Sequence, residues 1–204
     1  MTQRRLYLCC GDQPDLDRFL AQVLEGGVDV LQLRDHGLDD DAIRRVAPIF
    51  QARCEEFQVP FVLNDRPDLA AELGADGVHV GQDDASVASA RALLGEEAIV
   101  GLSTHAEAEL EAGLLEPVTY LSAGPVTPTP TKPGREGTGL GYATYATQRA
   151  NVPVFVTGGV TPGLLPALVA AGVRHFVVVR YLTEAQDPKA AATQLRRAIS
   201  ELVS

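Results

Sequence analysis

The chain has 204 residues, of which 46% are hydrophobic, so it can bury a full core, and an intrinsically disordered protein is excluded. Its formal charge of −10 excludes a generic nucleic-acid-binding surface, which needs an excess of lysine and arginine. The sequence contains neither an apolar run of about eighteen residues nor an apolar leader near its start, so we expect no membrane span and no signal peptide. The three cysteines fit neither a disulfide framework nor a zinc site, and we expect Cys9, Cys10 and Cys54 to be buried thiols in a reducing cytoplasm.

Short segments rich in β-branched residues alternate with segments of helical periodicity along the whole chain. The predicted strands occupy residues 6–10, 28–33, 61–63, 78–80, 99–102, 119–121, 154–156 and 176–179. This alternation is typical of parallel βα units. Eight such units without a linker predict an α/β protein with a single (β/α)8 barrel, a TIM barrel, over residues 1–204. An open doubly wound sheet is the alternative.

Helices are predicted from apolar spacing and from capping residues. One apolar face recurs within residues 15–25, at Leu16, Phe19, Leu20, Val23 and Leu24. The acidic residues 39–41 are expected to cap the second helix, in which Pro48 predicts a kink or a late start. Thr161-Pro162 is expected to open the seventh helix, and Asp187-Pro188 the last.

The connection after the sixth strand, at about residues 123–139, is rich in proline, glycine and threonine and has no periodicity. A connection of this length in a compact domain is usually functional. After a barrel strand it lies on the face where barrel enzymes carry out their chemistry, so we expect an active-site loop.

Polar residues recur where the predicted strands end, which in a barrel is one common mouth. They are Gln32, Arg34 and His36 after the second strand, Asn64 and Asp65 after the third, Asp84 after the fourth, Ser103 and His105 after the fifth, Lys132 after the sixth, Gly158 and Gly159 after the seventh, and Arg180 after the eighth. Helix capping explains any single Asp, Asn or Ser in this set. It does not explain the Gln, Arg, His and Lys residues at the same end, so we interpret the set as a site.

The residue types at this mouth suit phosphorylated ligands. Arg34, Lys132 and Arg180 can neutralise phosphate oxygens, and the backbone amides of a Gly-Gly turn can bind them. Asp65 and Asp84 offer two hard carboxylate ligands, which favour Mg²⁺ held partly by a substrate phosphate. The sequence therefore predicts a metal-assisted enzyme that acts on phosphorylated small molecules.

Four segments together resemble the thiamine-phosphate synthase family. They are Asn-Asp-Arg at residues 64–66, Gly-Ala-Asp-Gly-Val-His-Val-Gly-Gln-Asp-Asp at 74–84, Gly-Leu-Ser-Thr-His at 101–105, and the stretch from Gly-Pro to Thr-Pro-Thr-Lys at 124–132. The match runs from residue 32 to the terminal helix. The resemblance implies a (β/α)8 barrel that joins an aminopyrimidine diphosphate to a thiazole phosphate, with Mg²⁺ as cofactor. It also implies a dissociative reaction, in which diphosphate leaves before the thiazole nitrogen attacks.

The family's residue roles carry over to matching positions. The pyrimidine diphosphate would be held by Gln32, Arg34, His36, Asn64, Ser103 and Lys132. The thiazole phosphate would be held by Thr129, Thr131, Gly159, Val179 and Arg180. Asp65 and Asp84 would bind the metal. The expected partners are these small molecules, with neither nucleic acid nor membrane and with a homodimer as a compatible assembly.

Two positions depart from the family pattern. The family usually has Lys where this chain has His36, and often Ser where it has Arg180. A histidine can donate to phosphate, but its charge depends on pH in the neutral range. An arginine at position 180 can add a phosphate contact, and a contact made there through the backbone would not change.

Two rival functions stay open from the sequence. A thiazole tautomerase on the same barrel would use His105 as acid and base, whereas the retained Asp65, Asp84 and Lys132 favour the synthase. A non-catalytic thiazole-phosphate-binding barrel is suggested by the missing Lys at position 36. Among the other polar residues, we expect His79 and His175 to be structural and the glutamates of residues 107–116 to form a solvated face.

Overall fold

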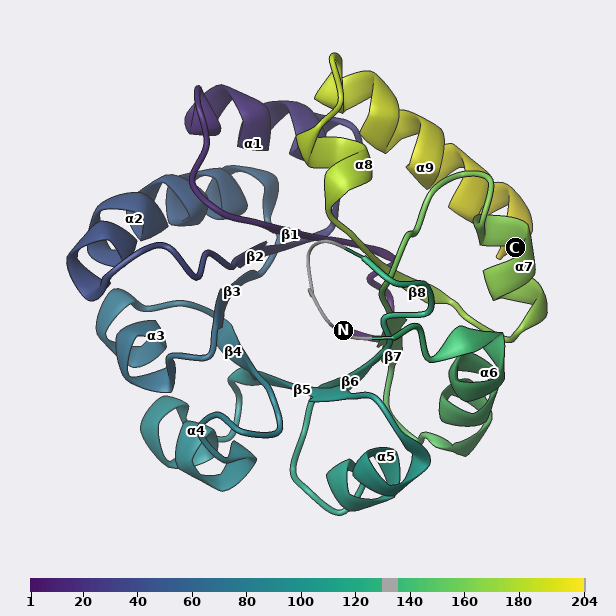
Figure 1. Ribbon diagram of the computed structural model, residues 1–204. Coiled ribbons are helices and arrows are strands. Elements are labelled where there is room, and N and C mark those ends of the chain that lie inside the picture. Colours follow the sequence, from purple (N-terminus) through teal and green to yellow (C-terminus); the bar gives the residue numbers. More distant parts are fainter. Residues whose placement is uncertain (130–135, 204) are drawn as a thin grey trace.

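The eight strands pair in sequence order, each parallel to the next, and β8 pairs back with β1 (Figure 1). The computed structural model describes residues 1–129 and 136–203. The strands are β1 (Leu6–Cys10), β2 (Val30–Leu33), β3 (Phe61–Asn64), β4 (Gly77–Val80), β5 (Ile99–Thr104), β6 (Tyr120–Ala123), β7 (Val154–Val156) and β8 (His175–Val178). This closed barrel confirms the predicted fold class and rules out the open sheet.

The helices form a ring around the barrel (Figure 1). They are α1 (Leu16–Glu25), α2 (Asp40–Phe57), α3 (Pro67–Leu73), α4 (Val87–Leu94), α5 (Glu107–Gly113), α6 (Gly139–Arg149), α7 (Leu165–Ala170), α8 (Arg180–Thr183) and α9 (Pro188–Leu202). Within residues 1–129 and 136–203, none is both long and apolar enough to cross a membrane. The predicted apolar face of α1 is buried in full.

The predicted start of the seventh helix is wrong, and for the second helix the late start, one of the two predicted effects of Pro48, is excluded. Helix α2 begins at Asp40 and continues through Pro48, with Asp39 as its cap, so it has no late start. Its buried face lies on both sides of the proline, and this packing offsets the backbone hydrogen bond that Pro48 cannot make. Helix α7 begins at Leu165, because the residues after Thr161 form a turn and Pro166 occupies the first helical turn. The cap of α9 is confirmed, since the Asp187 carboxylate accepts from the amide of Ala190 at 2.9 Å.

Side chains alternate between the two faces of each strand, and this alternation creates two separate cores. The larger core lies between the sheet and the helices. The smaller one consists of Tyr7, Val30, Val62, Tyr120, Phe155 and Val177. It fills the inside of the barrel with one residue each from six strands. Two residues further along these strands, the inward positions are polar or small, as with Cys9, Gln32 and Ser122. This change of chemistry converts the top of the filled barrel into the floor of a site.

Gly101 on β5 makes room for the aromatic side chains inside the barrel. It pairs with His79 on β4 and with Tyr120 on β6. A Cβ atom at this position would overlap the Tyr120 ring and the His79 ring nitrogen. Only glycine therefore lets both rings occupy the same layer.

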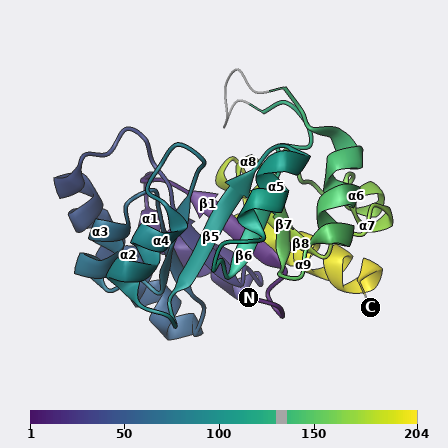
Figure 2. The ribbon, with the colours of Figure 1, turned by 90° about the horizontal axis from the view of Figure 1, so that it is seen from below.

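The connection between β6 and α6 rises from one end of the barrel, and both chain termini lie toward the other end (Figure 2). Its ends are held together by backbone hydrogen bonds. The amide of Thr138 donates to Pro125 O at 2.8 Å and the amide of Gly139 to Val126 O at 3.1 Å. The connection is thereby anchored at the mouth where the strands end.

Candidate active site

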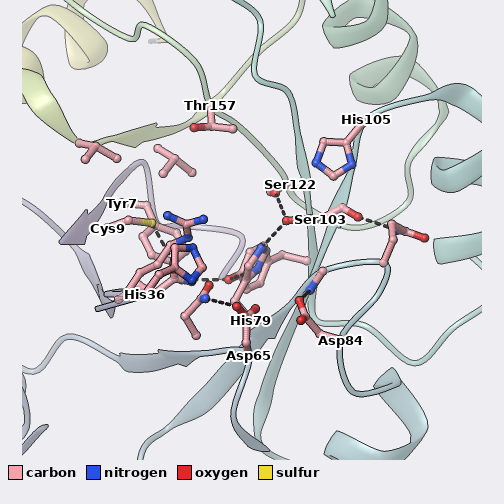
Figure 3. Close-up of a pocket in the computed structure, with 18 of the residues that line it drawn as sticks. Tyr7, Cys9, His36, Asp65, His79, Asp84, Ser103, His105, Ser122 and Thr157 are labelled. Carbon is pink, nitrogen blue, oxygen red and sulfur yellow. Dashed lines mark hydrogen bonds between the residues drawn. The ribbon is translucent and has the colours of Figure 1, made fainter. Parts of the chain in front are cut away.

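A cavity of about 360 Å³ opens at the carboxyl ends of the strands (Figure 3). Its wall combines residues from the floor of the barrel with residues from the loops after β2, β3, β4 and β5. Seven of the residues predicted to hold the pyrimidine diphosphate or the metal line it, namely Gln32, Arg34, His36, Asn64, Asp65, Asp84 and Ser103. The structure therefore brings together residues that are up to seventy positions apart in the chain. Lys132 lies outside the described residues.

Asp65 and Asp84 form the acidic side of this cavity, and Figure 3 shows both at its wall. Asp65 has a left-handed backbone with a φ of 61°, and its amide donates to His79 O at 2.8 Å. The Asp84 carboxylate accepts from the amide of Gly81 at 2.8 Å. Burial, together with the neighbouring Asp84 carboxyl, raises the pKa of Asp65 to about 6, and the charge of Arg34 opposes this shift. The half-buried carboxyl of Asp65 is thus held close to the exposed carboxyl of Asp84, and this like-charged neighbour disfavours its ionised form.

This pair fits a hard divalent cation. Carboxylate oxygens are the ligands that Mg²⁺ prefers, and it commonly takes one or two from the protein with the rest from water and phosphate. Among residues 1–129 and 136–203 there is no cluster of three or more His, Cys, Asp or Glu side chains suited to a metal. A cation held by Asp65 and Asp84 would accordingly need further oxygen ligands from a substrate.

The floor of the cavity is a layer of hydrogen-bonded side chains. The sequence analysis identified its ends, Gln32 and Ser103, but not the residues between them. Gln32 donates to the Tyr7 hydroxyl, which contacts the Tyr120 hydroxyl. His79 lies between the Tyr120 hydroxyl and Ser103 Oγ, 2.9 Å from each. His79 is buried as expected, yet it also lines the cavity, so a purely structural interpretation is incomplete.

Cys9 also contributes to this floor. Its thiol donates to Gln32 Oε1 at 3.1 Å, and it is partly exposed at the cavity, whereas Cys10 and Cys54 are buried. The expectation of three buried thiols is wrong for Cys9. The signal that was available is the alternation along β1, because inward-facing Tyr7 places Cys9 on the same side of the sheet.

A second cavity of about 280 Å³ adjoins the first. The two share Thr157, Val177 and Val179 in their walls. Four residues predicted to hold the thiazole phosphate line the second cavity, namely Thr129, Gly159, Val179 and Arg180. Thr131 lies outside the described residues.

The turn between β7 and α7 forms one side of the second cavity. Gly158 and Gly159 have φ values of 104° and 73°, which side chains other than glycine rarely adopt. The Thr127 hydroxyl donates to Gly158 O at 3.1 Å and ties the turn to the start of the connection after β6. Arg180 is exposed and contributes positive charge at the same cavity.

His105 lies on the wall of the first cavity, above Ser103 in Figure 3. The Glu109 carboxylate is 3.0 Å from its Nδ1 and accepts from its backbone amide at 2.7 Å. Glu111 pairs with Arg149 and accepts from the Tyr145 hydroxyl. The glutamates of residues 107–116 are therefore not merely a solvated face. His175 is buried at the opposite end of the barrel, where its Nδ1 lies 2.5 Å from Arg4 O.

A closed parallel barrel with two adjoining polar cavities at the carboxyl ends of its strands defines a (β/α)8-barrel enzyme of small-molecule metabolism. Residues 6–182 match the sequence pattern of the family described as thiamine monophosphate synthase. The thiamine-phosphate synthase of Streptomyces avermitilis is 42% identical over 202 residues, which cover 97% of this chain and 94% of that protein. The thiamine-phosphate synthase of Thermobifida fusca is 43% identical over 203 residues, covering 97% and 93%.

Among solved structures, a thiamine phosphate pyrophosphorylase from Pyrococcus furiosus superposes with a TM-score of 0.89 at 24% identity, covering 98% of this chain and 97% of that one. A 3-hexulose-6-phosphate synthase superposes with a TM-score of 0.66 at 21% identity, covering 95% of this chain and 99% of that one. At these identities the two structures show the barrel fold alone. The sequence matches show more: the chain belongs to the thiamine monophosphate synthase family, and it is a transferase of thiamine biosynthesis.

Proposed function

We propose that this enzyme condenses a hydroxymethyl-aminopyrimidine diphosphate with a thiazole ethyl phosphate, or its carboxylated form, to give thiamine phosphate and diphosphate. The observation that carries the proposal is the pair of adjoining cavities with different chemistry. One has two carboxylates, an arginine and a floor of hydrogen-bonding side chains, and the other has a glycine turn and an arginine. Two phosphorylated substrates bound side by side would meet at the shared wall of Thr157, Val177 and Val179.

In the first cavity, Arg34 and His36 would bind the diphosphate, with Asn64 alongside them and Lys132 added from the connection after β6. Gln32 and Ser103 would hold the aminopyrimidine ring on the floor. Arg34, the side-chain amides and a metal held by the two carboxylates would stabilise the leaving diphosphate, and this favours a dissociative substitution in which diphosphate departs first.

Asp65 and Asp84 would hold Mg²⁺, which would supply neutralising charge for the diphosphate. In the second cavity the amides of the Gly158-Gly159 turn and the side chain of Arg180 would bind the thiazole phosphate, with Thr129, Thr131 and the Val179 backbone. This binding would place the thiazole nitrogen toward the shared wall. We place the enzyme in the cytoplasm, where its free thiols would stay reduced.

The test is diphosphate release by the purified enzyme, with both substrates, with each alone, and with or without Mg²⁺. We expect release that requires both substrates and Mg²⁺, together with stoichiometric thiamine phosphate. A protein that binds both substrates and releases no diphosphate in the presence of Mg²⁺ would be the non-catalytic barrel.

One observation favours the tautomerase as a second candidate, namely His105 on the cavity wall with the Glu109 carboxylate at its Nδ1. This arrangement can set the ring for proton transfer. A tautomerase would interconvert thiazole phosphate isomers without pyrimidine or metal. Two results together would support the tautomerase over the synthase. The parent enzyme would incorporate deuterium from deuterated water into the thiazole ring but release no diphosphate, and His105→Asn would lose the deuterium incorporation.

A further inference from the structure

A continuous chain of hydrogen-bonding groups crosses the barrel under the first cavity. It begins at Gln32 on β2, whose Nε2 lies 3.0 Å from the Tyr7 hydroxyl, and the Tyr7 and Tyr120 hydroxyls are 2.9 Å apart. The Tyr120 hydroxyl is 2.9 Å from His79 Nδ1, and His79 Nε2 is 2.9 Å from Ser103 Oγ. Gln32 and Ser103 are the two ends. All five residues contribute to the cavity lining, although the side chains of the two tyrosines are almost fully buried. We define Gln32, Tyr7, Tyr120, His79 and Ser103 as the floor chain.

The floor chain has only two self-consistent directions. Burial raises the pKa of both Tyr7 and Tyr120, so each hydroxyl keeps its one proton. Each therefore accepts a hydrogen bond from one neighbour in the chain and donates to the other. If one hydroxyl turns, the other must turn as well, because two buried protons or two buried lone pairs would otherwise face each other. The orientation of the Gln32 amide is thereby linked to the proton position on a neutral His79 ring.

The Cys9 thiol selects one of the two directions. It donates to Gln32 Oε1 at 3.1 Å, which leaves the amide nitrogen of Gln32 to donate to Tyr7. Tyr7 then donates to Tyr120, and Tyr120 donates to His79 Nδ1. The His79 proton is consequently on Nε2, where it is donated to Ser103 Oγ. The Ser103 hydroxyl in turn keeps its own proton for an acceptor other than His79.

We propose that Tyr7 and Tyr120 are positioning residues that determine which pyrimidine the site accepts, by fixing the direction of the floor chain. This inference rests on the proposed function only for the identity of the ring. An aminopyrimidine places an amino donor beside a ring-nitrogen acceptor. A pyrimidinone of the same shape places an oxygen acceptor beside a ring N–H donor. The pyrimidinone pattern would match the floor chain only if every buried hydrogen bond in the floor chain reversed its direction. A fixed direction of the floor chain therefore excludes the pyrimidinone.

The first test needs no substrate. Long-range proton–nitrogen correlation spectra of the His79 ring report which nitrogen carries the proton, and the loss of its signals in His79→Gln assigns them. We expect the proton on Nε2 in the parent protein and a large change in the Nδ1 nitrogen shift in Tyr120→Phe, which keeps the ring packing against Phe155 but removes the hydroxyl that donates to Nδ1. Tyr142→Phe is the matched control, because this buried tyrosine donates to Thr104 Oγ1 at 2.6 Å and is outside the floor chain. A parent spectrum with the proton on Nδ1, or an unchanged spectrum in Tyr120→Phe, would overturn the proposal.

The second test measures selectivity. Dissociation constants for the aminopyrimidine diphosphate and its pyrimidinone counterpart are determined by calorimetry with Mg²⁺ and without thiazole phosphate. We expect the preference for the aminopyrimidine to fall roughly tenfold or more in Tyr120→Phe and Tyr7→Phe, and to persist in Tyr142→Phe. Equal loss of affinity for both ligands would show a merely structural role and overturn the proposal.

Tyr7→Phe breaks the same chain one bond earlier, so it replaces Tyr120→Phe in both tests if that variant does not fold. The two tests also separate this inference from the proposed function. If the enzyme makes no thiamine phosphate and binds neither pyrimidine, the His79 spectra still decide whether the tyrosines fix the chain's direction. In that outcome only the identity of the ligand would fall.

Discussion

At the scale of single residues, the pair Asp65 and Asp84 lowers the stability of the metal-free protein and, in the proposed function, binds the metal. Asp65 is held near Asp84 in a partly buried site, and its pKa is raised to about 6. Its folded-state pKa thus lies above the ordinary value near 3.9. The stability associated with its proton is fully present below about pH 4 and is lost as the pH rises through about 6. At neutral pH the metal-free protein carries this penalty.

Asp65→Asn should therefore stabilise the metal-free protein at neutral pH while it lowers turnover by on the order of 10² or more. Asparagine removes the charge and tolerates the left-handed backbone of this position. The melting temperature of the variant should exceed that of the parent by an amount that is small at pH 5 and grows toward pH 7.5. Mg²⁺ should raise the melting temperature of the parent more than that of the variant.

Asp83→Asn is the matched control, because Asp83 is exposed at the same cavity and lies outside the proposed metal pair. It should show neither the pH-dependent gain in stability nor the loss of turnover. A variant at position 65 that is less stable than the parent at every pH would contradict the argument.

His36 is one of the two positions at which the resemblance implies a departure from the family, and it lies exposed on the wall of the first cavity. Lysine is a residue type that is charged throughout the neutral range, whereas the charge of histidine as a residue type depends on pH. The kcat/KM for the pyrimidine diphosphate should fall on the alkaline side in the parent, and His36→Lys should flatten this fall or move it to higher pH without abolishing activity. Identical alkaline limbs in both enzymes would show that His36 takes no part in binding the diphosphate.

The sequence predicted those cavity residues whose side-chain type is unusual at the end of a strand. Arg34, Asp65 and Ser103 stand out because polar residues follow buried strands there. Tyr7 and Tyr120 did not stand out, since an aromatic residue within a strand is ordinarily core. In the structure their rings pack in the barrel core, and their hydroxyls belong to the polar floor of the cavity. Only the three-dimensional pairing of the two hydroxyls reveals this polar role.

At the scale of elements, strand positions were predictable and some boundaries were not. The predicted limits of β1 and β7 agree with the structure, whereas β2 begins at Val30, two residues after its predicted start. Just before this start, Asp29 N donates to Leu6 O, but the Asp29 carboxylate, rather than a backbone carbonyl, accepts from the amides of Arg5 and Leu6. A side chain that replaces a backbone acceptor leaves no trace in the pattern of apolar residues.

The connection between β6 and α6 is the element whose position most affects the chemistry. Its ends are joined by backbone hydrogen bonds, and its described part reaches the second cavity at Thr129. Lys132→Ala should slow the chemical step by roughly 10²–10³, as expected for the loss of one contact that stabilises developing charge. The affinity for thiazole phosphate should change little.

Single-turnover measurements with saturating substrates separate these effects. Lys189→Ala is a suitable control, because Lys189 pairs with Glu25 on the outer ring of helices and lies outside both cavities. An unchanged single-turnover rate in Lys132→Ala would show that Lys132 supplies no charge to the reaction.

At the scale of the whole molecule, the two ends of the barrel have different roles. The fold class was predictable because eight βα units of similar length leave little choice but closure. Closure brings the carboxyl ends of all strands to one mouth, where both cavities lie, and the opposite ends to a face held by structural contacts. What the sequence could not provide is the division of the mouth into two adjoining cavities, since this depends on which inward side chains meet across the barrel.

Asp29 allows a direct test of this division of roles. Its buried carboxylate lies at the amino-terminal end, where it accepts from Arg5 N at 2.9 Å, from Leu6 N at 2.9 Å and from Arg196 Nη1 at 2.6 Å. Asp29→Asn keeps the shape but turns one acceptor into a donor that faces these groups. It should lower the free energy of unfolding by about 1–3 kcal/mol, measured by urea denaturation. Arg196→Gln removes only the half-exposed ion pair and should lower it by less than about 1 kcal/mol.

The kcat/KM of folded Asp29→Asn at 25 °C should equal that of the parent, because the substitution leaves the mouth of the barrel untouched. Asp65→Asn should show the reverse, with a more stable metal-free protein and an impaired reaction. Asp29 and Asp65 lie at opposite ends of one barrel. This placement explains why the same aspartate-to-asparagine change should have opposite effects on stability and on kcat/KM at the two positions. If Asp29→Asn lowers kcat/KM as strongly as Asp65→Asn while the protein is fully folded, the two ends are coupled and this separation of stability from catalysis is wrong.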